Sequence, residues 1–234
     1  MLSIIIPAYN EEDNIKRIGP ELIPVLKNLG KYEIVVIDDG SKDDTVKEVR
    51  KLQKKYKNIR LVMHGVNKGL GYAIMTGIEN VKGDFTITLD SDFTFHPREI
   101  PKLLAQRDYY DCVIGSHFAK GGKTENVPFF RIILSKVVTF LYSLVLGKKI
   151  SSVTSVFRLY RTKDLKDLTL TDKGFMINAE ILFRLLQRKK SIIEVPVTLS
   201  TRIYGKTKIN IQREIFNNIK FLMKIAWWRT QAIL

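Results

Sequence analysis

Residues 84–92, Asp-Phe-Thr-Ile-Thr-Leu-Asp-Ser-Asp, are the stretch of sequence on which the interpretation of the fold depends. The run from Asp84 to Leu89 is rich in β-branched and large apolar residues, which predicts a buried strand. Asp90 and Asp92 then place two carboxylates one residue apart at its end. Such carboxylates repel each other unless a cation or hydrogen-bond donors offset their charge. A hard divalent cation shared with phosphate oxygens is one solution. A capped turn before His96-Pro97 is the other.

Short β-branched runs and helical patterns alternate around this stretch. The other predicted strands of the first hundred residues are Leu2–Pro7, Glu33–Asp38 and Arg60–His64. The predicted helices lie near Asp13–Asn28, Thr45–Lys55, Leu70–Glu79 and Pro97–Gln106. This order predicts an α/β fold with a mostly parallel, doubly wound, Rossmann-like sheet flanked by helices. Ligands of such sheets bind beyond the carboxyl ends of the strands, which here are residues 7–12, 38–44 and 90–92.

Two further polar turns stand at predicted strand ends. In Asp38-Asp39-Gly40-Ser41, one carboxylate could accept hydrogen bonds from a base or ribose, and Gly40 permits a close turn. A plain turn with a helix N-cap is the alternative. The third turn, Pro7-Ala8-Tyr9-Asn10-Glu11-Glu12, ends the first strand. Three polar turns on one edge of one sheet favour a nucleotide site.

The second half of the chain has a looser pattern. Strands are predicted at Tyr110–Ser116 and Ile192–Leu199, a loop at Ala119–Asn126, and helices at Phe129–Leu146, Asn178–Arg188 and Arg213–Arg229. The first of these helices has an apolar stripe formed by Phe130, Ile133, Val137, Leu141 and Leu144, and the last has one formed by Ile215, Ile219, Leu222, Ala226 and Trp227. Each of these two helices fits either a membrane interface or a core or dimer contact. Trp227 and Trp228 fit interfacial anchors or packing.

Composition limits the class of protein. The 234 residues are 45% apolar, and Cys112 is the single cysteine, so no intramolecular disulfide framework exists and the thiol is expected to pack in a strand. The longest uncharged apolar run, 137–147, is short of the roughly 18 residues that span a bilayer. No signal peptide is recognised, so the chain is predicted to be cytoplasmic.

Charge is unevenly distributed along the chain. Residues 1–100 hold 15 basic and 15 acidic side chains, whereas 101–234 hold 24 basic and 9 acidic ones, which gives the whole net charge of +15. The basic half indicates an anionic partner or a solvated lysine-rich face.

Four motifs together resemble a known family. They are Ile4-Ile5 with Pro7-Ala8-Tyr9-Asn10-Glu11-Glu12, Ile37-Asp38-Asp39-Gly40-Ser41, Asn67-Lys68-Gly69-Leu70-Gly71 and Leu89-Asp90-Ser91-Asp92. Their order and spacing resemble family 2 inverting glycosyltransferases of the GT-A fold, and within it the dolichol-phosphate mannose synthases and related polyprenyl-phosphate glycosyltransferases. The likeness continues to about residue 209 through Gly115-Ser116-His117, Lys120-Gly121-Gly122, Pro128, Arg131, Ser135, Thr154-Ser155, Phe157-Arg158, Glu194-Val195-Pro196, Arg202, Tyr204-Gly205 and Lys208.

This resemblance implies a single GT-A domain over 1–234, with a nucleotide-sugar half at 1–110 and an acceptor and membrane-interface half at 111–234. The implied activity is inverting transfer of a hexose, mannose from GDP-mannose, to a polyprenyl (dolichyl) phosphate. It would use Mg²⁺ or Mn²⁺ and take place at the cytoplasmic membrane face, with the chain peripherally associated. A UDP-sugar (glucose) donor or a non-lipid acceptor is the alternative. The implied partners are a nucleotide diphosphate sugar, a polyprenyl phosphate lipid and a membrane surface, with room for a membrane-protein partner or homo-oligomer.

The resemblance also assigns site residues. The nucleotide-sugar would be held by Pro7, Tyr9, Glu11, Ile37, Asp39, Asp90, Ser91 and Asp92. The acceptor phosphate would be held by His117, Arg131, Ser135, Arg202 and Lys208. The metal would be held by Asp92, Asp90 and Thr94, and the catalytic residues would be Asp92, Arg131 and Arg202. The chain departs from the family pattern at His117, Ser152 and Val156, where Arg, Asp and Gly are usual, and at Thr94, where Gln is frequent.

Two other classes of function are alternatives to this one. A nucleic-acid-binding module is suggested by the charge alone, but the sequence lacks a recognition motif and a basic sheet face with interleaved aromatics, so no nucleic-acid partner is predicted. A catalytically silent relative, which binds nucleotide or lipid phosphate without transfer, is motivated by the departures at His117, Ser152 and Val156. Metal-dependent sugar transfer would exclude it.

Overall fold

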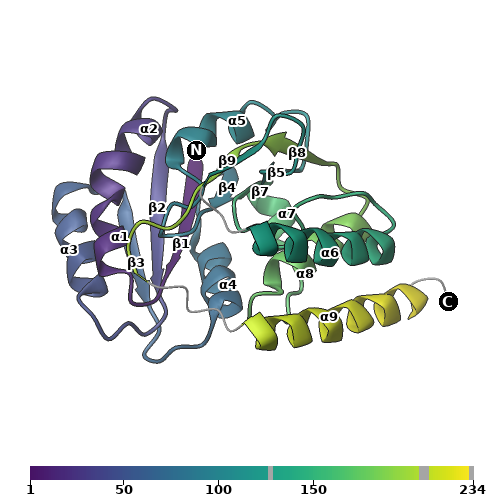
Figure 1. Cartoon of the computed structure of the whole chain (residues 1–234). Coiled ribbons are helices and arrows are strands. Elements are labelled where there is room, and N and C mark those ends of the chain that lie inside the picture. The colour runs from purple at the N-terminus through teal and green to yellow at the C-terminus, as the bar shows by residue number, and fades with distance from the viewer. Residues whose placement is uncertain (126–128, 206–210, 232–234) are drawn as a thin grey trace.

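The computed structural model of the chain describes residues 1–125, 129–205 and 211–231, with only the backbone described at 129–135, 211–215 and 229–231. Seven strands form one sheet in the order β3-β2-β1-β4-β7-β5-β8 (Figure 1). Their bounds are β1 Leu2–Ala8, β2 Tyr32–Asp38, β3 Ile59–Met63, β4 Phe85–Thr88, β5 Cys112–Ser116, β7 Arg158–Arg161 and β8 Ile192–Pro196. All neighbours in this sheet are parallel except β7, which runs antiparallel to both β4 and β5. A short second sheet pairs β6 Lys123–Thr124 with β9 Thr198–Leu199.

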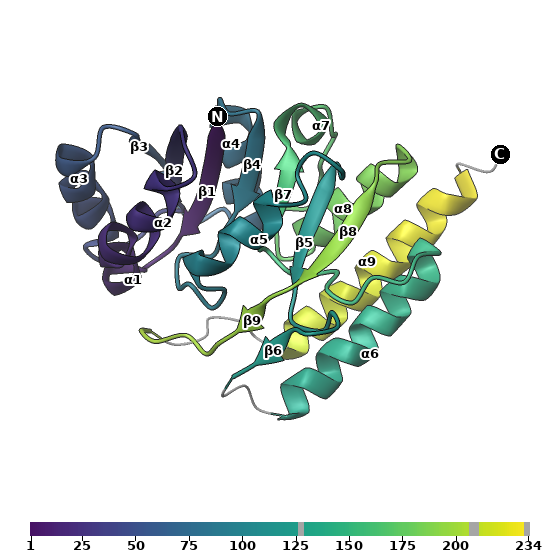
Figure 2. The same cartoon turned by 90° about the horizontal axis from the view of Figure 1, so that it is seen from above.

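Helices cover both faces of the sheet (Figures 1 and 2). Their bounds are α1 Glu12–Lys16, α2 Ile23–Lys27, α3 Thr45–Lys55, α4 Leu70–Asn80, α5 Ile100–Leu104, α6 Phe129–Leu146, α7 Thr162–Lys166, α8 Ile177–Gln187 and α9 Ile211–Gln231. On β1, Ile4 and Ile6 point into a core with the residues of α1, α2 and α5, whereas Ile5 points into a second core with α4, α8 and α9. This alternation follows from the two-residue period of a strand, and it explains why the strands read as continuous apolar runs.

The predicted fold class is confirmed, and several boundaries differ in instructive ways. The expected helix Asp13–Asn28 is α1, a π-helical turn at Ile18–Leu22 and α2. Pro20 lies in that turn and lacks the N–H that an α-helix needs for its i to i−4 bond, so the helical register changes there. The expected strand Ile192–Leu199 is divided into β8 and β9 after Pro196. Strands β6 and β7 and helix α7 were not predicted, because each spans at most five residues and carries little periodicity.

Candidate active site

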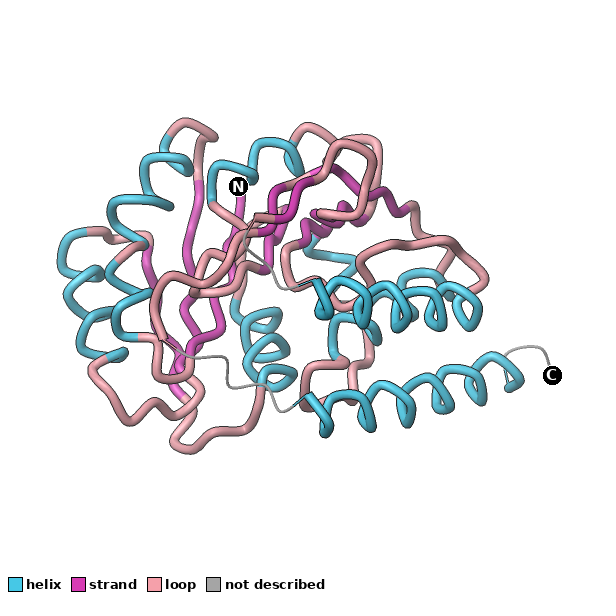
Figure 3. Tube along the Cα trace, in the orientation of Figure 1, coloured by secondary structure: helices cyan, strands magenta, loops and turns pink. Residues whose placement is uncertain are grey.

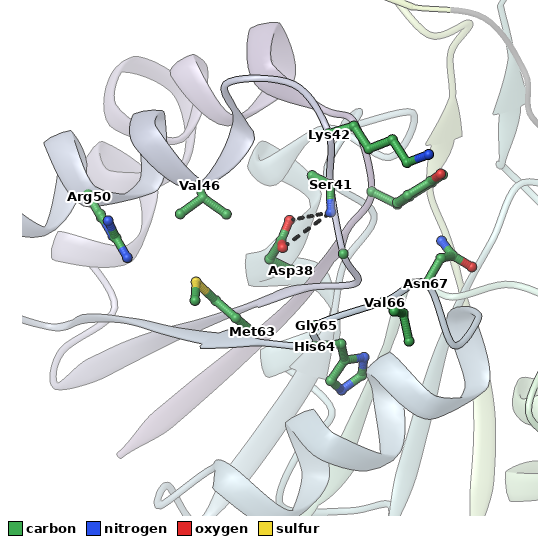
Figure 4. A pocket seen from close by; sticks show the side chains of 12 residues that line it. Asp38, Ser41, Lys42, Val46, Arg50, Met63, His64, Gly65, Val66 and Asn67 are labelled. Atoms are coloured by element: carbon green, nitrogen blue, oxygen red, sulfur yellow. Dashed lines mark hydrogen bonds between the residues drawn. The ribbon is translucent and has the colours of Figure 1, made fainter.

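A cavity of about 610 Å³ opens at the carboxyl ends of β1, β2 and β3 (Figure 4). Its lining consists of Tyr9, Asp38, Gly40, Ser41, Lys42, Val46, Arg50, Met63, His64, Gly65, Val66 and Asn67. The cavity combines one carboxylate, two exposed cations and the apolar side chains of α3 and β3. This mixture suits a flat ring with polar edges, and its place beyond the strand ends is the one that doubly wound sheets use for nucleotides.

Asp38 and Asp39 have different environments although they are adjacent. Asp38 lines the cavity, and both of its carboxylate oxygens accept a hydrogen bond of 3.3 Å from the Ser41 amide. Asp39 is turned toward the next loop, where its carboxylate accepts from the amides of Lys68 at 2.9 Å and Gly69 at 2.8 Å. His64 Nδ1 lies 2.7 Å from the same carboxylate. Asp39 therefore holds the loop between β3 and α4, whereas Asp38 offers acceptor oxygens to the cavity.

Hydrogen bonds join the loops that follow β1 and β2. The Asn10 amide donates to Ser41 Oγ at 2.9 Å, and Asn10 Oδ1 accepts from the Lys42 amide at 2.8 Å. The Glu11 amide donates to Thr45 Oγ1 at 2.8 Å. Asn10 has φ of +53°, a conformation that asparagine tolerates better than most side chains. These reciprocal bonds fix the rim of the cavity.

The acidic turn after β4 is braced from two sides. Asp92 Oδ1 accepts from the Thr94 amide at 3.0 Å, and the Asp92 carbonyl accepts from Arg17 Nη1 at 2.6 Å. The residue between them, Phe93, has φ of +52°, which costs energy for an aromatic side chain. The Arg17 guanidinium also lies 5.1 Å above the Phe93 ring, so one arginine supports both the carbonyl and the strained residue. The brace fixes the direction of the Asp92 carboxylate.

Arg202 connects this turn to the loop after β1. Its Nη2 lies 3.0 Å from Asp92 Oδ2 and 3.0 Å from Glu11 Oε1, and its Nε lies 3.1 Å from Asp92 Oδ2. Asp90 belongs to the same cluster. Burial and the neighbouring Asp92 carboxylate together raise the pKa of Asp90 to about 8, although Arg202 opposes the rise. A carboxyl that is this reluctant to ionise lacks sufficient positive charge around it.

The acidic turn can supply one or two of the oxygen ligands that a hard cation needs. Asp90 and Asp92 supply carboxylate oxygens, which Mg²⁺ and Mn²⁺ prefer, and a nearby cation would oppose the upward shift of the Asp90 pKa. Among the described residues, no group of three or more His, Cys, Asp and Glu side chains could hold a metal ion. The protein would thus supply one or two ligands, and the remaining ligands would be phosphate and water oxygens. Thr94, the third predicted ligand, is half-buried next to Asp92.

His117 follows β5 and lies partly buried among aromatic rings. Its ring centre is 3.9 Å from that of Phe118 and 6.3 Å from that of Phe95. Nδ1 is buried and has no hydrogen-bond partner, and burial lowers the pKa of His117 to about 4. The side chain is therefore neutral at physiological pH. Where the family usually has an arginine, this chain presents an uncharged donor or acceptor.

A serine cluster takes the place of the aspartate that the family usually has at position 152. Ser116 Oγ lies 2.7 Å from Ser151 Oγ and 2.8 Å from Ser152 Oγ. Ser151 in turn donates its amide and hydroxyl to Glu194 at 2.8 Å and 2.9 Å. Arg158, which is fully buried, donates to the carbonyls of Ser152 and Asn178. This network fixes the loop before β7 against β5 and β8.

The remaining predicted site residues divide into three groups. Pro7 and Ile37 are buried opposite each other in β1 and β2, and Ser91 is buried after β4. These three residues support the sheet edge and do not line the cavity. Tyr9 lines the cavity and Glu11 contacts Arg202. The Arg131 and Ser135 side chains and the whole of Lys208 fall outside the described residues, so their assignments stay predictions.

Helices α6 and α9 lie side by side and present an apolar outer face (Figures 1 and 2). Its exposed large side chains are Val137, Phe140, Leu141, Leu144, Phe216, Ile219, Met223 and Trp227. The opposite side of the pair packs on the core through Tyr142, Phe221, Ile225 and Trp228. The predicted stripe of α6 thus faces solvent where it is described. Of the two tryptophans, Trp227 is 60% exposed and Trp228 stacks on Phe183. No helix in the described part of the chain is long and apolar enough to cross a membrane.

Three contributors to the site escaped prediction from the sequence. Arg17 forms an i,i+4 ion pair with Glu21, so it reads as an ordinary helix-surface charge. His64 reads as the end of a strand, and only the fold brings it to Asp39. Arg50 lines the cavity from the second turn of α3, where the helical pattern predicts only an ordinary solvent-exposed charge. Periodicity carried no signal for any of these tertiary contacts.

The doubly wound sheet, the cavity at its strand ends and the acidic turn together define an α/β protein of the GT-A type. A sequence profile described as Glycosyl transferase family 2 matches residues 3–169. The chain therefore belongs to glycosyl transferase family 2.

Individual relatives point in the same direction. A dolichol-phosphate mannosyltransferase of Pyrococcus furiosus is 33% identical over 230 residues, which are 97% of this chain and 64% of that protein. A polyprenol monophosphomannose synthase of Mycolicibacterium smegmatis is 31% identical over 96% of this chain and 85% of its own length. The chain thus spans less than two thirds of the Pyrococcus relative. Among solved structures, glucosyl-3-phosphoglycerate synthase of Mycobacterium tuberculosis, in complex with Mn²⁺ and UDP, is similar with a TM-score of 0.70, 21% identity and coverage of 98% of this chain and 79% of that one. At that identity it supports the fold alone.

Proposed function

We propose that the chain transfers mannose from GDP-mannose to a polyprenyl (dolichyl) phosphate, with inversion of the anomeric carbon, with the aid of Mg²⁺ or Mn²⁺ and at the cytoplasmic face of a membrane. The observation that carries the proposal is that the Asp38 cavity and the acidic turn share one sheet edge, joined by the contact of Arg202 with Glu11 and Asp92. The base would occupy the cavity and the diphosphate would lie over the turn. The names of the Pyrococcus and Mycolicibacterium relatives support the mannose and the lipid phosphate.

The chemistry of Asp38 favours guanine over uracil. Guanine presents two adjacent donors, N1–H and the N2 amino group, which match the two oxygens of a carboxylate. Uracil presents one N–H between two carbonyl oxygens, which a carboxylate would repel. The Lys42 and Arg50 side chains, which line the same cavity, are donors for the O6 and N7 acceptors of guanine. The cavity therefore supports GDP as the leaving group.

The transfer needs little proton chemistry from the protein. An ionised lipid phosphate is already a nucleophile; its oxygen forms a bond to the anomeric carbon while the bond from that carbon to the diphosphate oxygen breaks on the opposite face. A divalent cation bound at the acidic turn would neutralise the charge that develops on the leaving diphosphate. The residues of the chain would hold the donor. Asp38 and Tyr9 would contact the base, and the braced Asp92 would lie at the diphosphate. Positioning and charge stabilisation supply the rate.

The outer face of α6 and α9 supports a membrane-bound acceptor. Its apolar side chains are exposed, and Lys136, Lys148, Lys149, Lys220 and Lys224 lie on the same two helices or directly after α6. An apolar surface with basic flanks is the composition of an interfacial membrane contact, in which the apolar side chains enter the acyl boundary and the lysines meet anionic headgroups.

The test is a screen of nucleotide sugars with a short polyprenyl phosphate in detergent, with and without EDTA, that measures lipid-linked sugar. GDP-mannose with Mg²⁺ or Mn²⁺ is expected to yield product and EDTA to abolish it. Product from UDP-glucose alone would replace the donor, and transfer to a soluble acceptor alone would replace the lipid. If no donor gives product with either acceptor, the proposed function is wrong.

A further inference from the structure

Arg202 occupies the place that a donor would need. The guanidinium bridges the Asp92 and Glu11 carboxylates at 3.0 Å each, and the side chains involved are 19%, 14% and 8% exposed. Asp92 Oδ2 is the oxygen that Arg202 engages, while Oδ1 is engaged by the Thr94 amide. Both oxygens of the best candidate metal ligand are therefore already engaged. A cation shared with a diphosphate would compete with the guanidinium for Asp92 Oδ2, because two positive charges repel each other strongly at contact distance.

The segment that carries Arg202 is fastened across the acidic turn by weak contacts. After β9 it runs as a loop past the ends of β4 and β1 toward α1 (Figure 3). The Ser200 amide donates to the Thr94 carbonyl at 2.9 Å, and Asn14 Nδ2 donates to the Tyr204 carbonyl at 3.4 Å. Within residues 200–205, Thr201, Ile203, Tyr204 and Gly205 are exposed and Arg202 is partly buried. Such an exposed strap can open locally without disturbing the core.

We propose that Arg202 is a placeholder cation, which closes the empty donor site by bridging Glu11 and Asp92 and is displaced when a metal–nucleotide complex binds. This proposal rests on the proposed function, since it takes the acidic turn to be the site of the metal and diphosphate. The displaced guanidinium is released on the acceptor side of the turn, on the strap that follows β9. The nearest demand for a positive charge is then the phosphate of the acceptor. Donor binding thereby prepares the acceptor site, and the order of binding is donor first.

The energetic consequence is a reduced affinity for the metal–nucleotide complex. A site that is competent for only a fraction of the time binds its ligand more weakly by that fraction. If the bridge is worth about as much as a well-formed, partly buried ion pair, on the order of 1 kcal/mol, the closed form exceeds the open form by roughly fivefold. Its removal therefore tightens binding by that factor. An arginine whose role was only to grip the donor diphosphate would have the opposite effect, because its loss would weaken binding.

The experiment measures Mn²⁺ affinity by the electron paramagnetic resonance signal of free Mn²⁺, at saturating GDP and without any acceptor. Three full-length variants are compared with the unchanged protein. Arg202→Gln removes the bridge and the charge. Arg202→Lys keeps the charge but lacks the planar fork that reaches both carboxylates. Arg98→Gln removes an exposed arginine of the same region that takes no part in the site. Circular dichroism confirms that each variant is folded.

The expected result is that Mn²⁺ binds about fivefold more tightly to Arg202→Gln, about twofold more tightly to Arg202→Lys and unchanged to Arg98→Gln. Hydrogen exchange at residues 199–204 is expected to accelerate in the unchanged protein when Mn²⁺ and GDP are added. Weaker Mn²⁺ binding in both Arg202 variants would overturn the placeholder role. So would tightening in Arg202→Gln alone with unaltered Arg202→Lys, because that pattern requires only through-space charge. If the unchanged protein binds neither Mn²⁺–GDP nor Mn²⁺–UDP, the proposed function fails, which is distinct from failure of the placeholder.

Discussion

The edge of the sheet where β1, β2 and β4 end differs from the outer face of α6 and α9 in how its side chains are satisfied. At the sheet edge, Asp39 receives two backbone hydrogen bonds and a histidine contact, and Asp92 receives a backbone amide and a guanidinium. On the helix face, Phe140 and Leu144 are each 61% exposed. Asp39 and Asp92 at this sheet edge, called the donor edge below, thus have hydrogen-bond partners within the chain. The large apolar side chains of the helix face, in contrast, remain exposed to solvent.

The difference teaches where substitutions should act. A preorganised polar edge derives its effect from fixed charges, so removal of one group leaves its partners uncompensated. An exposed apolar face contributes little to folding, so its substitution should change association with a surface and leave stability alone. Each prediction below tests one side of this contrast or the junction between the two sides.

The largest effect is expected at the donor edge, from Asp92→Asn. The amide keeps the hydrogen bond from Thr94 but loses the negative charge that would hold a cation and that Arg202 contacts. Removal of a single preorganised electrostatic group costs about 3–4 kcal/mol of barrier, so kcat should fall by about 10²–10³-fold. Transfer to the lipid phosphate is measured at saturating donor and metal. The matched control, Asp108→Asn, changes an exposed aspartate far from the turn, and equal losses in the two variants would contradict the assignment.

The next effect is expected at the junction of the two halves, from Gly71→Ala. A Cβ at this position of α4 would lie within 3.0 Å of the Asp172 carbonyl and the Lys173 backbone. Backbone cannot yield as a flexible side chain would, so the helix must shift away from the loop before α8. Overpacking of this kind costs about 1–3 kcal/mol, and the thermal midpoint should fall accordingly. Gly65→Ala is the control, since its Cβ meets nothing within 4 Å. A thermal midpoint that is unchanged in both variants would show that α4 and the loop before α8 are not closely packed at this position.

The contrast also marks how far the sequence could predict this molecule. The helices at Thr45–Lys55 and Phe129–Leu146 were predicted with the bounds that the structure has, because amphipathic periodicity over three or more turns is a strong local signal. Strand β7 was missed. It has four residues, runs antiparallel in an otherwise parallel sheet and contains the buried Arg158, and none of these features is visible in a local pattern.

The site shows the same limit in finer detail. The three polar turns and the edge they share follow from strand order, so the sequence could predict where the site lies. It could not predict which carboxylate of Asp38 and Asp39 faces the cavity, because that depends on how the loop at 67–69 folds back on Asp39. Arg202 and Asp92 are in contact although they are 110 positions apart in the sequence. The family resemblance assigned Arg202 to phosphate binding, and only the structure places it on the carboxylates of Asp92 and Glu11.

The helix face is tested by the double variant Phe140→Ser with Leu144→Ser. Both side chains are exposed, so the free energy of unfolding should change by less than about 0.5 kcal/mol. Binding to vesicles of anionic phospholipid should weaken by about thirtyfold, because two large apolar side chains no longer enter the acyl boundary, at roughly 1 kcal/mol each. Co-sedimentation measures the binding. Tyr109→Ser removes an aromatic side chain that is 76% exposed elsewhere and should not alter it. Loss of stability with intact vesicle binding would instead indicate a packing role for the face.

The smallest effect concerns His117, which lies between the donor edge and the helix face. Burial lowers the pKa of His117 to about 4, below its unfolded value of about 6.5. The unfolded chain therefore binds a proton more readily between these values, so the histidine costs stability progressively as pH falls from about 6.5 toward 4 and costs nothing above that range. Because the side chain is only partly buried, the loss should be about 1 kcal/mol, well below the full value of the shift.

The measurement is the free energy of unfolding of His117→Gln and of the unchanged chain at pH 7 and at pH 5. The unchanged chain should lose more stability between these values than the variant, and the imidazole of His117 should titrate near pH 4 by nuclear magnetic resonance, which is tractable because the chain has only three histidines. A titration well above pH 6.5 would mean that His117 gains a proton beside an anion, and a titration near pH 6.5 would mean that the ring is solvated. In the proposed reaction, a neutral His117 leaves Arg202 and the lysines of the basic half to supply positive charge to the acceptor phosphate. The proposed release of Arg202 from Asp92 would then be the step that charges this side of the site.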